Sequence, residues 1–175
     1  SGIGREMAVL FAKEGARVVV VDTNSEKGEE TVKIIEGGSG EAIFVRADVR
    51  READARKMVS VAIDEYGKLN ILCNNAGIIL VRSLADTAEE EWDRLIDINL
   101  KGVFLCSKYA IPEMIEAKGG SIINMGSIMA YVGSPGESVY CASKAGVVLL
   151  TKAMAIDYGK FNIRVNCVCP GTGET

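Results

Sequence analysis

Apolar residues along the chain follow two alternating spacings. Short continuous apolar runs rich in β-branched residues, such as RVVVV at 17–21, predict strands that are buried on both faces. Segments in which apolar residues recur every three or four positions predict helices. On this basis we expect strands at 17–21, 42–46, 69–73, 121–125 and 163–169. We expect helices at 4–15, 25–36, 51–66, 89–118 and 138–158, with the long 89–118 stretch interrupted near Asn99 and Pro112.

Strands and helices that alternate at short intervals are typical of βαβ units in a parallel sheet. We therefore expect an α/β fold, a Rossmann-like doubly wound parallel sheet in three layers, in a single domain over residues 1–175. The sequence begins with SGIG, the end of a Gly-rich turn that in such folds follows a central strand, and it ends just after a strand. We expect the domain to continue beyond both ends, and the chain alone to form two half-sheets with unpaired edges.

Composition and charge limit the classes of partner that this chain is expected to bind. The chain is 48% hydrophobic, which is too much for a disordered chain, but no continuous apolar run reaches the roughly 18–20 residues of a membrane span. Acids and bases are interspersed at a net charge of −4, without a basic stripe. We expect neither a membrane nor a nucleic-acid partner.

The cysteines and the missing histidine limit the chemistry. Five scattered cysteines without a C-x-x-C motif predict reduced thiols and a cytoplasmic location. Cys167 and Cys169 lie on one face of a predicted strand and are poorly placed to bridge each other. The absence of histidine excludes Ser-His-Asp catalysis, histidine-based zinc sites and a histidine acid/base, and we expect no metal site.

The first turn and the first strand together predict a dinucleotide site. Glycines in SGIG allow a pyrophosphate to approach the backbone, and the N-terminus of the helix that follows attracts its charge. Asp22 ends the strand and lies 20 residues after Gly2, where a carboxylate binds the adenosine ribose. Because a carboxylate repels a 2′-phosphate, this pattern favours NAD over NADP. Asp22 could instead cap the helix that begins near Ser25.

Polar residues follow other strands at the edge where ligands bind in open α/β sheets. Asp48, in ADV, could accept a bond from adenine or cap the next helix, and NNAG at 74–77 could line a ligand or form an Asx turn. Ser127 ends SIINMGS and could hold a substrate oxygen. Asn99 interrupts a helical pattern, which indicates a kink, a functional carbonyl or a helix end.

The segment SVYCASKAGVVLL (138–150) places a tyrosine and a lysine four residues apart. Residues i and i+4 of a helix share a face, with Cβ atoms about 5–6 Å apart, so Tyr140 and Lys144 are expected neighbours. An ammonium near a phenol favours the phenolate, and a cationic nicotinamide ring would add to this effect, which suits a general acid/base. The alternative is an ordinary surface pair, but the small residues between and after the two favour close approach of a ligand.

These motifs, in this order, resemble the single-domain subfamily of the short-chain dehydrogenase/reductase family over nearly the whole chain. The resemblance implies an NAD(P)-dependent oxidoreductase, with NAD as the favoured cofactor, that transfers a hydride reversibly to or from a secondary alcohol or ketone. Substrates of the family include 3-oxoacyl thioesters, sugars, hydroxy acids and steroids. The stretch NCVCPGT resembles that of 3-oxoacyl and 3-hydroxyacid reductases and favours substrates of these classes.

The resemblance also implies roles for individual residues. Tyr140 would be the acid/base, Lys144 would tune it and bind the nicotinamide ribose, and Ser127 would orient the substrate carbonyl. Asn99 would hold a water through its main-chain carbonyl. The cofactor would lie on Gly2, Ile3 and Gly4 (pyrophosphate), Asp22 (adenosine ribose), Asp48 and Val49 (adenine), Asn75, Ala76 and Gly77 (cofactor wall), Pro170 and Gly171 (nicotinamide) and Thr175 (carboxamide). Gly173 departs from the family, which has a β-branched residue there.

Two other functions remain open: an NAD-binding sensor or scaffold without catalysis, and a sugar-nucleotide epimerase or dehydratase, which uses a similar Tyr–Lys pair. The apolar segments 78–81 and 129–132 line a substrate pocket or only pack. The segments 100–115 and 147–155 carry apolar residues on more than one face, and relatives pair these helices in tetramers. We therefore expect a homotetramer.

Overall fold

Strands and helices alternate along residues 2–171, the part of the chain that the computed structural model describes. The strands are β1 (Arg17–Asp22), β2 (Glu41–Arg46), β3 (Ile71–Asn74), β4 (Gly120–Met125) and β5 (Ile163–Val168). The α-helices are α1 (Gly2–Lys13), α2 (Ser25–Gly37), α3 (Glu52–Tyr66), α4 (Glu89–Ile96), α5 (Gly102–Glu116) and α6 (Ser138–Tyr158). Each predicted strand and helix is present with bounds within two residues of the expected ones, apart from the long 89–118 stretch, which is divided.

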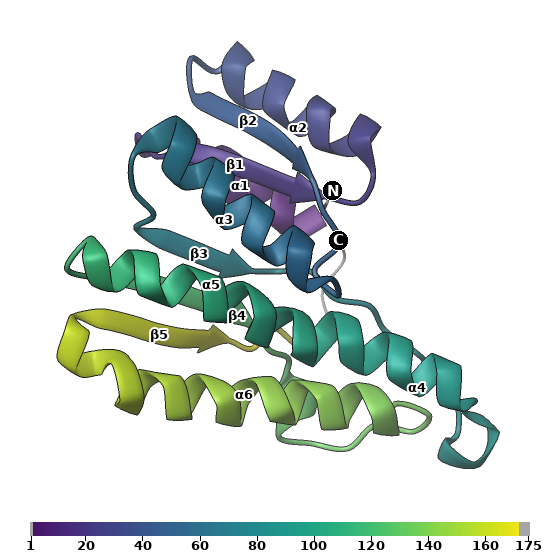
Figure 1. Ribbon diagram of the computed structural model, residues 1–175. Coiled ribbons are helices and arrows are strands. Elements are labelled where there is room, and N and C mark those ends of the chain that lie inside the picture. Colours follow the sequence, from purple (N-terminus) through teal and green to yellow (C-terminus); the bar gives the residue numbers. More distant parts are fainter. Residues whose placement is uncertain (1, 172–175) are drawn as a thin grey trace.

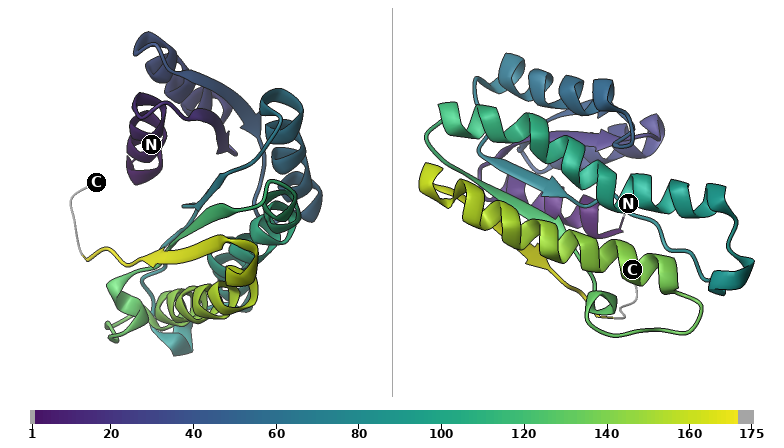
Figure 2. Two further views of the ribbon diagram at one scale, coloured as in Figure 1. Left: turned by 90° about the vertical axis from the view of Figure 1, so that its left-hand side faces the viewer. Right: turned by 60° about the horizontal axis from the view of Figure 1, so that its bottom comes forward.

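The strands form two separate parallel sheets, which confirms the expected half-sheets. β1 pairs with β2 in one sheet, and β4 lies between β3 and β5 in the other. All strands point the same way (Figure 1), with α1 and α2 on one face and α3, α5 and α6 on the other (Figure 2). The predicted α/β, Rossmann-like arrangement is therefore confirmed.

A cleft lies between the facing, unpaired edges of the two sheets, at β1 and β3. Its walls include the β-branched residues of β1 and the start of β3. At the end where the strands point, its rim is formed by the start of α1, the end of β1 and the segment after β3. The carboxyl edges of both sheets thus face one opening, where ligands bind in open α/β folds.

The long helical stretch is divided at one of the two expected positions. The residues Asp97–Lys101 form a π-helix between α4 and α5, so the interruption predicted near Asn99 is confirmed. Pro112 lies inside α5 without ending it, so the second predicted interruption is wrong. The proline removes only one helical hydrogen bond, and the buried side chains of Ile111 and Met114 on either side hold α5 against the core.

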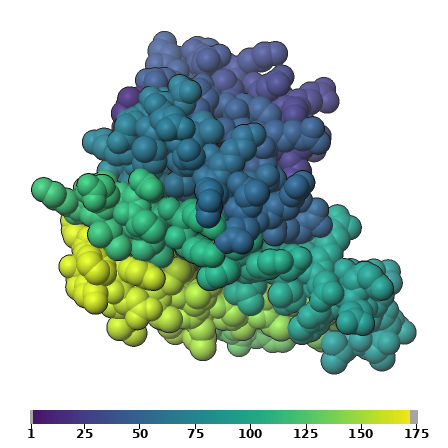
Figure 3. Space-filling view, viewed as in Figure 1, coloured from purple at the N-terminus to yellow at the C-terminus, as the bar shows by residue number. Residues whose placement is uncertain are grey.

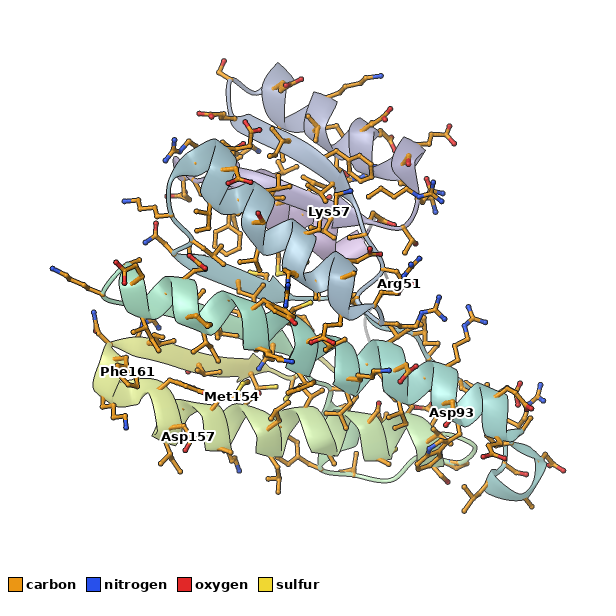
Figure 4. All side chains as sticks on the ribbon, viewed as in Figure 1. Arg51, Lys57, Asp93, Met154, Asp157 and Phe161 are labelled. Atoms are coloured by element: carbon orange, nitrogen blue, oxygen red, sulfur yellow. The ribbon has the colours of Figure 1, made fainter. Side chains whose placement is uncertain are left out.

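Helix α6 has the predicted bounds and is the longest element. The segment Ser138–Phe161 is long and apolar enough, by length and composition alone, to cross a membrane. In this fold it is a core helix: Val147 and Met154 are buried, and α6 packs against β4 and β5. Figure 4 shows Met154 between α6 and β5, and Asp157 pointing away from the sheet. One face of α6 therefore supports the sheet and the other is exposed.

Candidate active site

Tyr140 and Lys144 lie one turn apart at the start of α6, as their spacing predicts. The Nζ atom of Lys144 is 5.7 Å from the centre of the Tyr140 ring. Lys144 is only 5% exposed, and its ammonium donates a 2.7 Å hydrogen bond to the carbonyl oxygen of Met125 at the end of β4. Burial lowers the pKa of Lys144, while the nearby Cys167 and Cys169 act in the opposite direction. The reading of an ordinary surface pair is therefore wrong for the lysine, which is buried and fixed.

Ser127 lies buried just after β4, on the segment that packs against α6. Its Oγ accepts a 3.2 Å hydrogen bond from the backbone N–H of Met129 and caps the short helix Ile128–Ala130. The N–H of Ile128 donates to the carbonyl of Pro170, at 3.0 Å. The backbone that follows Ser127 is thus joined by one hydrogen bond to the proline predicted to lie near nicotinamide.

Asn99 lies in the π-helix and is almost fully buried. Its Oδ1 accepts a 2.8 Å bond from the N–H of Ile78, and its Nδ2 donates to the Ile78 carbonyl at 2.9 Å. Nδ2 also donates to Oγ of Ser143, at 3.2 Å, and this hydroxyl donates to the Tyr140 carbonyl at 2.7 Å. The side chain of Asn99 therefore ties the segment after β3 to the turn of α6 that carries the tyrosine. π-helical turns of this kind are frequent at functional sites.

A buried polar network beneath these residues was not predicted. Nδ2 of Asn74 donates to Oδ1 of Asn124 at 2.8 Å and to Oγ of Ser107 at 3.2 Å. Nδ2 of Asn124 in turn donates to Oγ1 of Thr151 on α6, at 2.8 Å. The signal in the sequence is one asparagine in each of two apolar strands; they are neighbours because Asn74 and Asn124 are paired in register.

Glycines bring the start of α1 close to the end of β3. A Cβ on Gly4 would lie 2.6 Å from Nδ2 of Asn75, so the asparagine can approach only because residue 4 is glycine. A Cβ on Gly77 would lie 3.4 Å from both the Lys144 ammonium and Oδ1 of Asn99. Gly2 has a φ of +57°, in the left-handed region that favours glycine.

The two acidic residues at the strand ends differ in their surroundings. Oδ1 of Asp22 accepts a 2.9 Å bond from the N–H of Asn24, and it is Asn24 that caps α2 by accepting from the N–H of Lys27. The alternative that Asp22 caps α2 is therefore wrong. Asp48 binds the guanidinium of Arg50, with Nη2 and Oδ2 2.6 Å apart, and this hydrogen bond lowers the pKa of Asp48.

Asp48 does not cap the next helix either. The residue in the cap position of α3 is Arg51, at the start of the helix in Figure 4, and it makes no side-chain cap. Instead, the N–H of Asp48 donates to Oδ2 of Asp54 at 2.9 Å, within the first turn of α3. Asp48 thus lines the cleft, with one side of its carboxylate bound to Arg50.

The structure brings the predicted cofactor residues together in two groups. One group lines the cleft between the sheets: Gly4, Asp22, Asp48, Val49, Asn75, Ala76 and Gly77. The other follows β4 and β5 and begins α6: Ser127, Tyr140, Lys144, Pro170 and Gly171. The groups meet where Lys144 and Asn99 approach Gly77. Gly2 and Ile3 lie in the first turn of α1, and Thr175 lies outside the described residues.

The residues present fit a dinucleotide. The close approach of backbone at Gly4 and Gly77, the N-terminus of α1 and the carboxylate of Asp22 at the rim of the cleft are the features that hold a pyrophosphate and a ribose. Beside them, Tyr140 and the buried ammonium of Lys144 form a phenol–ammonium pair suited to proton transfer. The arrangement combines a candidate dinucleotide site at the rim of the cleft with an acid/base.

The family model for short chain dehydrogenases matches residues 1–175. An uncharacterised oxidoreductase of Thermotoga maritima is 44% identical over 175 residues, which are 100% of this chain and 69% of that protein. The 3-oxoacyl-[acyl-carrier-protein] reductase FabG of the same organism is 41% identical over 175 residues (100% and 71%), and the cyclopentanol dehydrogenase of a Comamonas species is 43% identical over 174 residues (99% and 70%).

The fold is shared with solved structures. The crystal structure of a short-chain type dehydrogenase/reductase from Mycobacterium marinum superposes with a TM-score of 0.95 at 38% identity. The match covers 98% of this chain and 70% of that one.

Proposed function

We propose, because the chain belongs to the short-chain dehydrogenase/reductase family, that it transfers a hydride between NAD(H) and a secondary alcohol or its ketone, with Tyr140 as the acid/base. Membership of the family establishes a dehydrogenase/reductase that uses NAD(P) and acts on CH–OH or keto groups. The observation that carries the finer proposal is the ammonium of Lys144, buried between the Tyr140 ring and the Met125 carbonyl. A buried ammonium fixed beside a phenol favours the phenolate that removes a hydroxyl proton.

Four residues of this chain have distinct roles in the proposed reaction. The Ser127 hydroxyl orients the substrate oxygen, and Tyr140 takes the proton from the alcohol or returns it to the ketone. Lys144 stabilises the charge on Tyr140, and Asn99 holds the segment after β3 in place against α6. Bound NAD would supply the hydride acceptor. The protein therefore contributes orientation, a tuned acid and a fixed cation.

We propose that the substrate carries an apolar body. The segments 78–83 and 131–137 meet where the N–H of Arg82 donates to the Gly136 carbonyl at 2.6 Å, and the guanidinium of Arg82 is paired with Glu91. The chain around α4 projects from the body on the side where the strands end (Figure 3). The exposed side chains of these segments are mostly apolar: Ile79, Val81, Tyr131 and Val132.

A substrate panel tests this function. We expect NADH to form with cyclic secondary alcohols, such as cyclopentanol, or with 3-hydroxyacyl thioesters, the classes named by two relatives. Turnover of nucleotide sugars without net NADH release would instead indicate an epimerase or dehydratase. Binding of NAD without turnover of any member of the panel would favour a sensor or scaffold.

Asp22 supports the preference for NAD, since its carboxylate lies at the rim of the cleft and Asn24 is bound through one oxygen. Asp22→Ala should lower kcat/KM with NAD about 10- to 100-fold, the value of one hydrogen bond to a charged group. It should change kcat/KM with NADP little or raise it, because the repulsion of the 2′-phosphate is lost. The ratio of kcat/KM for the two cofactors is the measurement.

The matched control for Asp22→Ala is Asp64→Ala, on the exposed face of α3. It should leave the cofactor ratio unchanged. A ratio that stays the same in Asp22→Ala would assign cofactor choice to other residues.

We propose a homotetramer that uses the exposed face of α6 together with α5. Leu149 and Ile156 lie seven residues apart on one stripe of α6 and are 65% and 82% exposed, and Phe104 is exposed on α5. A double substitution, Leu149→Glu with Ile156→Glu, should convert the tetramer to smaller species because it places charges in an apolar contact. Light scattering measures the mass, and a monomeric parent protein would contradict the proposal.

A further inference from the structure

Two cysteine thiols lie side by side where β5 ends. The Sγ atoms of Cys167 and Cys169 are 3.8 Å apart, and both thiols are free and half-buried. Residues two apart on an extended strand point to the same side, which explains the proximity. The established dehydrogenase chemistry requires neither thiol.

Gly126, in the neighbouring strand segment, makes room for both sulfurs. A Cβ at this position would lie 2.7 Å from Sγ of Cys167 and 2.7 Å from Sγ of Cys169. The N–H of Gly126 donates to the Val168 carbonyl at 2.8 Å, so the backbone that carries the pair is fixed against the glycine. The pair and the glycine are therefore matched, since any side chain at residue 126 would displace the sulfurs.

The spacing of the sulfurs suits a tetrahedral ion. With zinc–sulfur bonds of about 2.3 Å, two sulfurs at this separation subtend an angle of about 110° at the metal, close to the tetrahedral angle. We propose that Cys167 and Cys169 form a two-thiolate site for a thiophilic divalent cation, Zn²⁺, and that its occupation inhibits the enzyme. Binding forms two sulfur–zinc bonds, breaks two S–H bonds and releases two protons, without oxidation or reduction.

The remaining positions on the ion fall to water. Among residues 2–171, no group of three or more His, Cys, Asp or Glu side chains could hold a metal, so the protein supplies two thiolates. A site with two protein ligands binds an ion reversibly, so the ion can regulate the activity of the enzyme.

The proposed inhibition follows from the position of the cysteine pair in the fold. It rests on the proposed function. Gly126 lies between Met125, whose carbonyl accepts from Lys144, and Ser127. An ion on the two sulfurs presses against this turn. The displaced turn disturbs the serine and the cation on which proton transfer depends.

Cd²⁺ is the probe for binding, because thiolate-to-cadmium charge transfer absorbs in the ultraviolet. Titration of the intact, reduced protein should show one bound Cd²⁺ per chain, displaced by Zn²⁺. Cys167→Ser or Cys169→Ser should weaken binding about 100-fold, since the second thiolate binds intramolecularly. Cys141→Ser is the matched control, a half-buried thiol outside the pair, and should bind as the parent does. Equal binding by the parent and the Cys167→Ser variant, or no charge-transfer band, would overturn the site.

Gly126→Ala is a second variant, which keeps both cysteines in the sequence. Its methyl group should displace the sulfurs and weaken Cd²⁺ binding, and undiminished binding would contradict the matched geometry. The activity measurement is separate: Zn²⁺ should inhibit the parent and the Cys141→Ser variant, with reversal by a chelator, and spare Cys169→Ser. Equal inhibition of Cys169→Ser would assign the effect to another site. The Cd²⁺ titration does not depend on turnover, so failure of the proposed function leaves the metal site testable.

Discussion

Replacement of Tyr140 by Phe should lower kcat for alcohol oxidation about 1,000-fold, the middle of the range for a general acid/base. The substitution removes one oxygen and keeps the ring that packs near Lys144, at 5.7 Å from its ammonium. Without the phenol, the proposed acceptor of the hydroxyl proton is lost, and the chain has no histidine to replace it. The measurement is the initial rate of NADH formation with the best substrate of the panel.

The control is Tyr158→Phe, at the other end of α6, which should keep the parent rate. NADH binding, followed by fluorescence, should weaken by no more than about tenfold in Tyr140→Phe, because the hydroxyl contributes at most one neutral hydrogen bond of about 0.5–1.5 kcal/mol to the cofactor. An unchanged kcat in Tyr140→Phe would end the assignment of this residue as acid/base, whereas a rate lost together with NADH binding would indicate a structural role.

The order and bounds of the elements could be predicted because they depend on local patterns. The continuous apolar run of β1 and the 3.6-residue period of α6 are properties of neighbouring residues, and both elements were placed within one residue. The interruption at Asn99 was predicted for the same reason, since asparagine is a poor helix former. The carboxyl ends of the strands were then the expected place for the site.

The remaining features depend on contacts between residues far apart in the sequence. The network of Asn74, Asn124 and Thr151 forms only when β3, β4 and α6 are in register, and the match between Gly126 and the thiols of β5 needs two strands. Pro112 was predicted to interrupt α5 because its local effect was counted without the buried residues that flank it. Tertiary packing overrides helix propensity in this way.

Burial of the Lys144 ammonium fixes the geometry of the site but lowers the stability of the fold. Lys144 has no ion pair among residues 2–171, and its ammonium is satisfied by the Met125 carbonyl. Burying a charge without an opposite charge destabilises a fold, and the lowered pKa of Lys144 expresses the same effect. We therefore expect stability and activity to oppose each other at this residue.

Lys144→Met should lower kcat/KM about 1,000-fold and raise the free energy of unfolding at pH 7 by about 1 kcal/mol. The thioether fills the same space without a charge to desolvate, although the Met125 carbonyl loses its donor. Because the pKa of Lys144 is lowered in the folded state, the unfolded chain binds more protons, so the parent gains stability as the pH rises through the folded pKa towards about 10.4. The advantage of the variant should therefore shrink at high pH. Urea unfolding at several pH values measures the difference.

Lys152→Met, on the exposed face of the same helix, is the matched control. It removes the same charge from a solvated position, so activity should be kept and stability should change by less than about 0.5 kcal/mol at any pH. A Lys144→Met variant that is less stable than the parent by several kcal/mol would show that the hydrogen bond to the Met125 carbonyl outweighs desolvation. In that case the lysine holds β4 to α6 as a structural residue, and its loss of activity would follow from the displaced turn at Gly126 and Ser127.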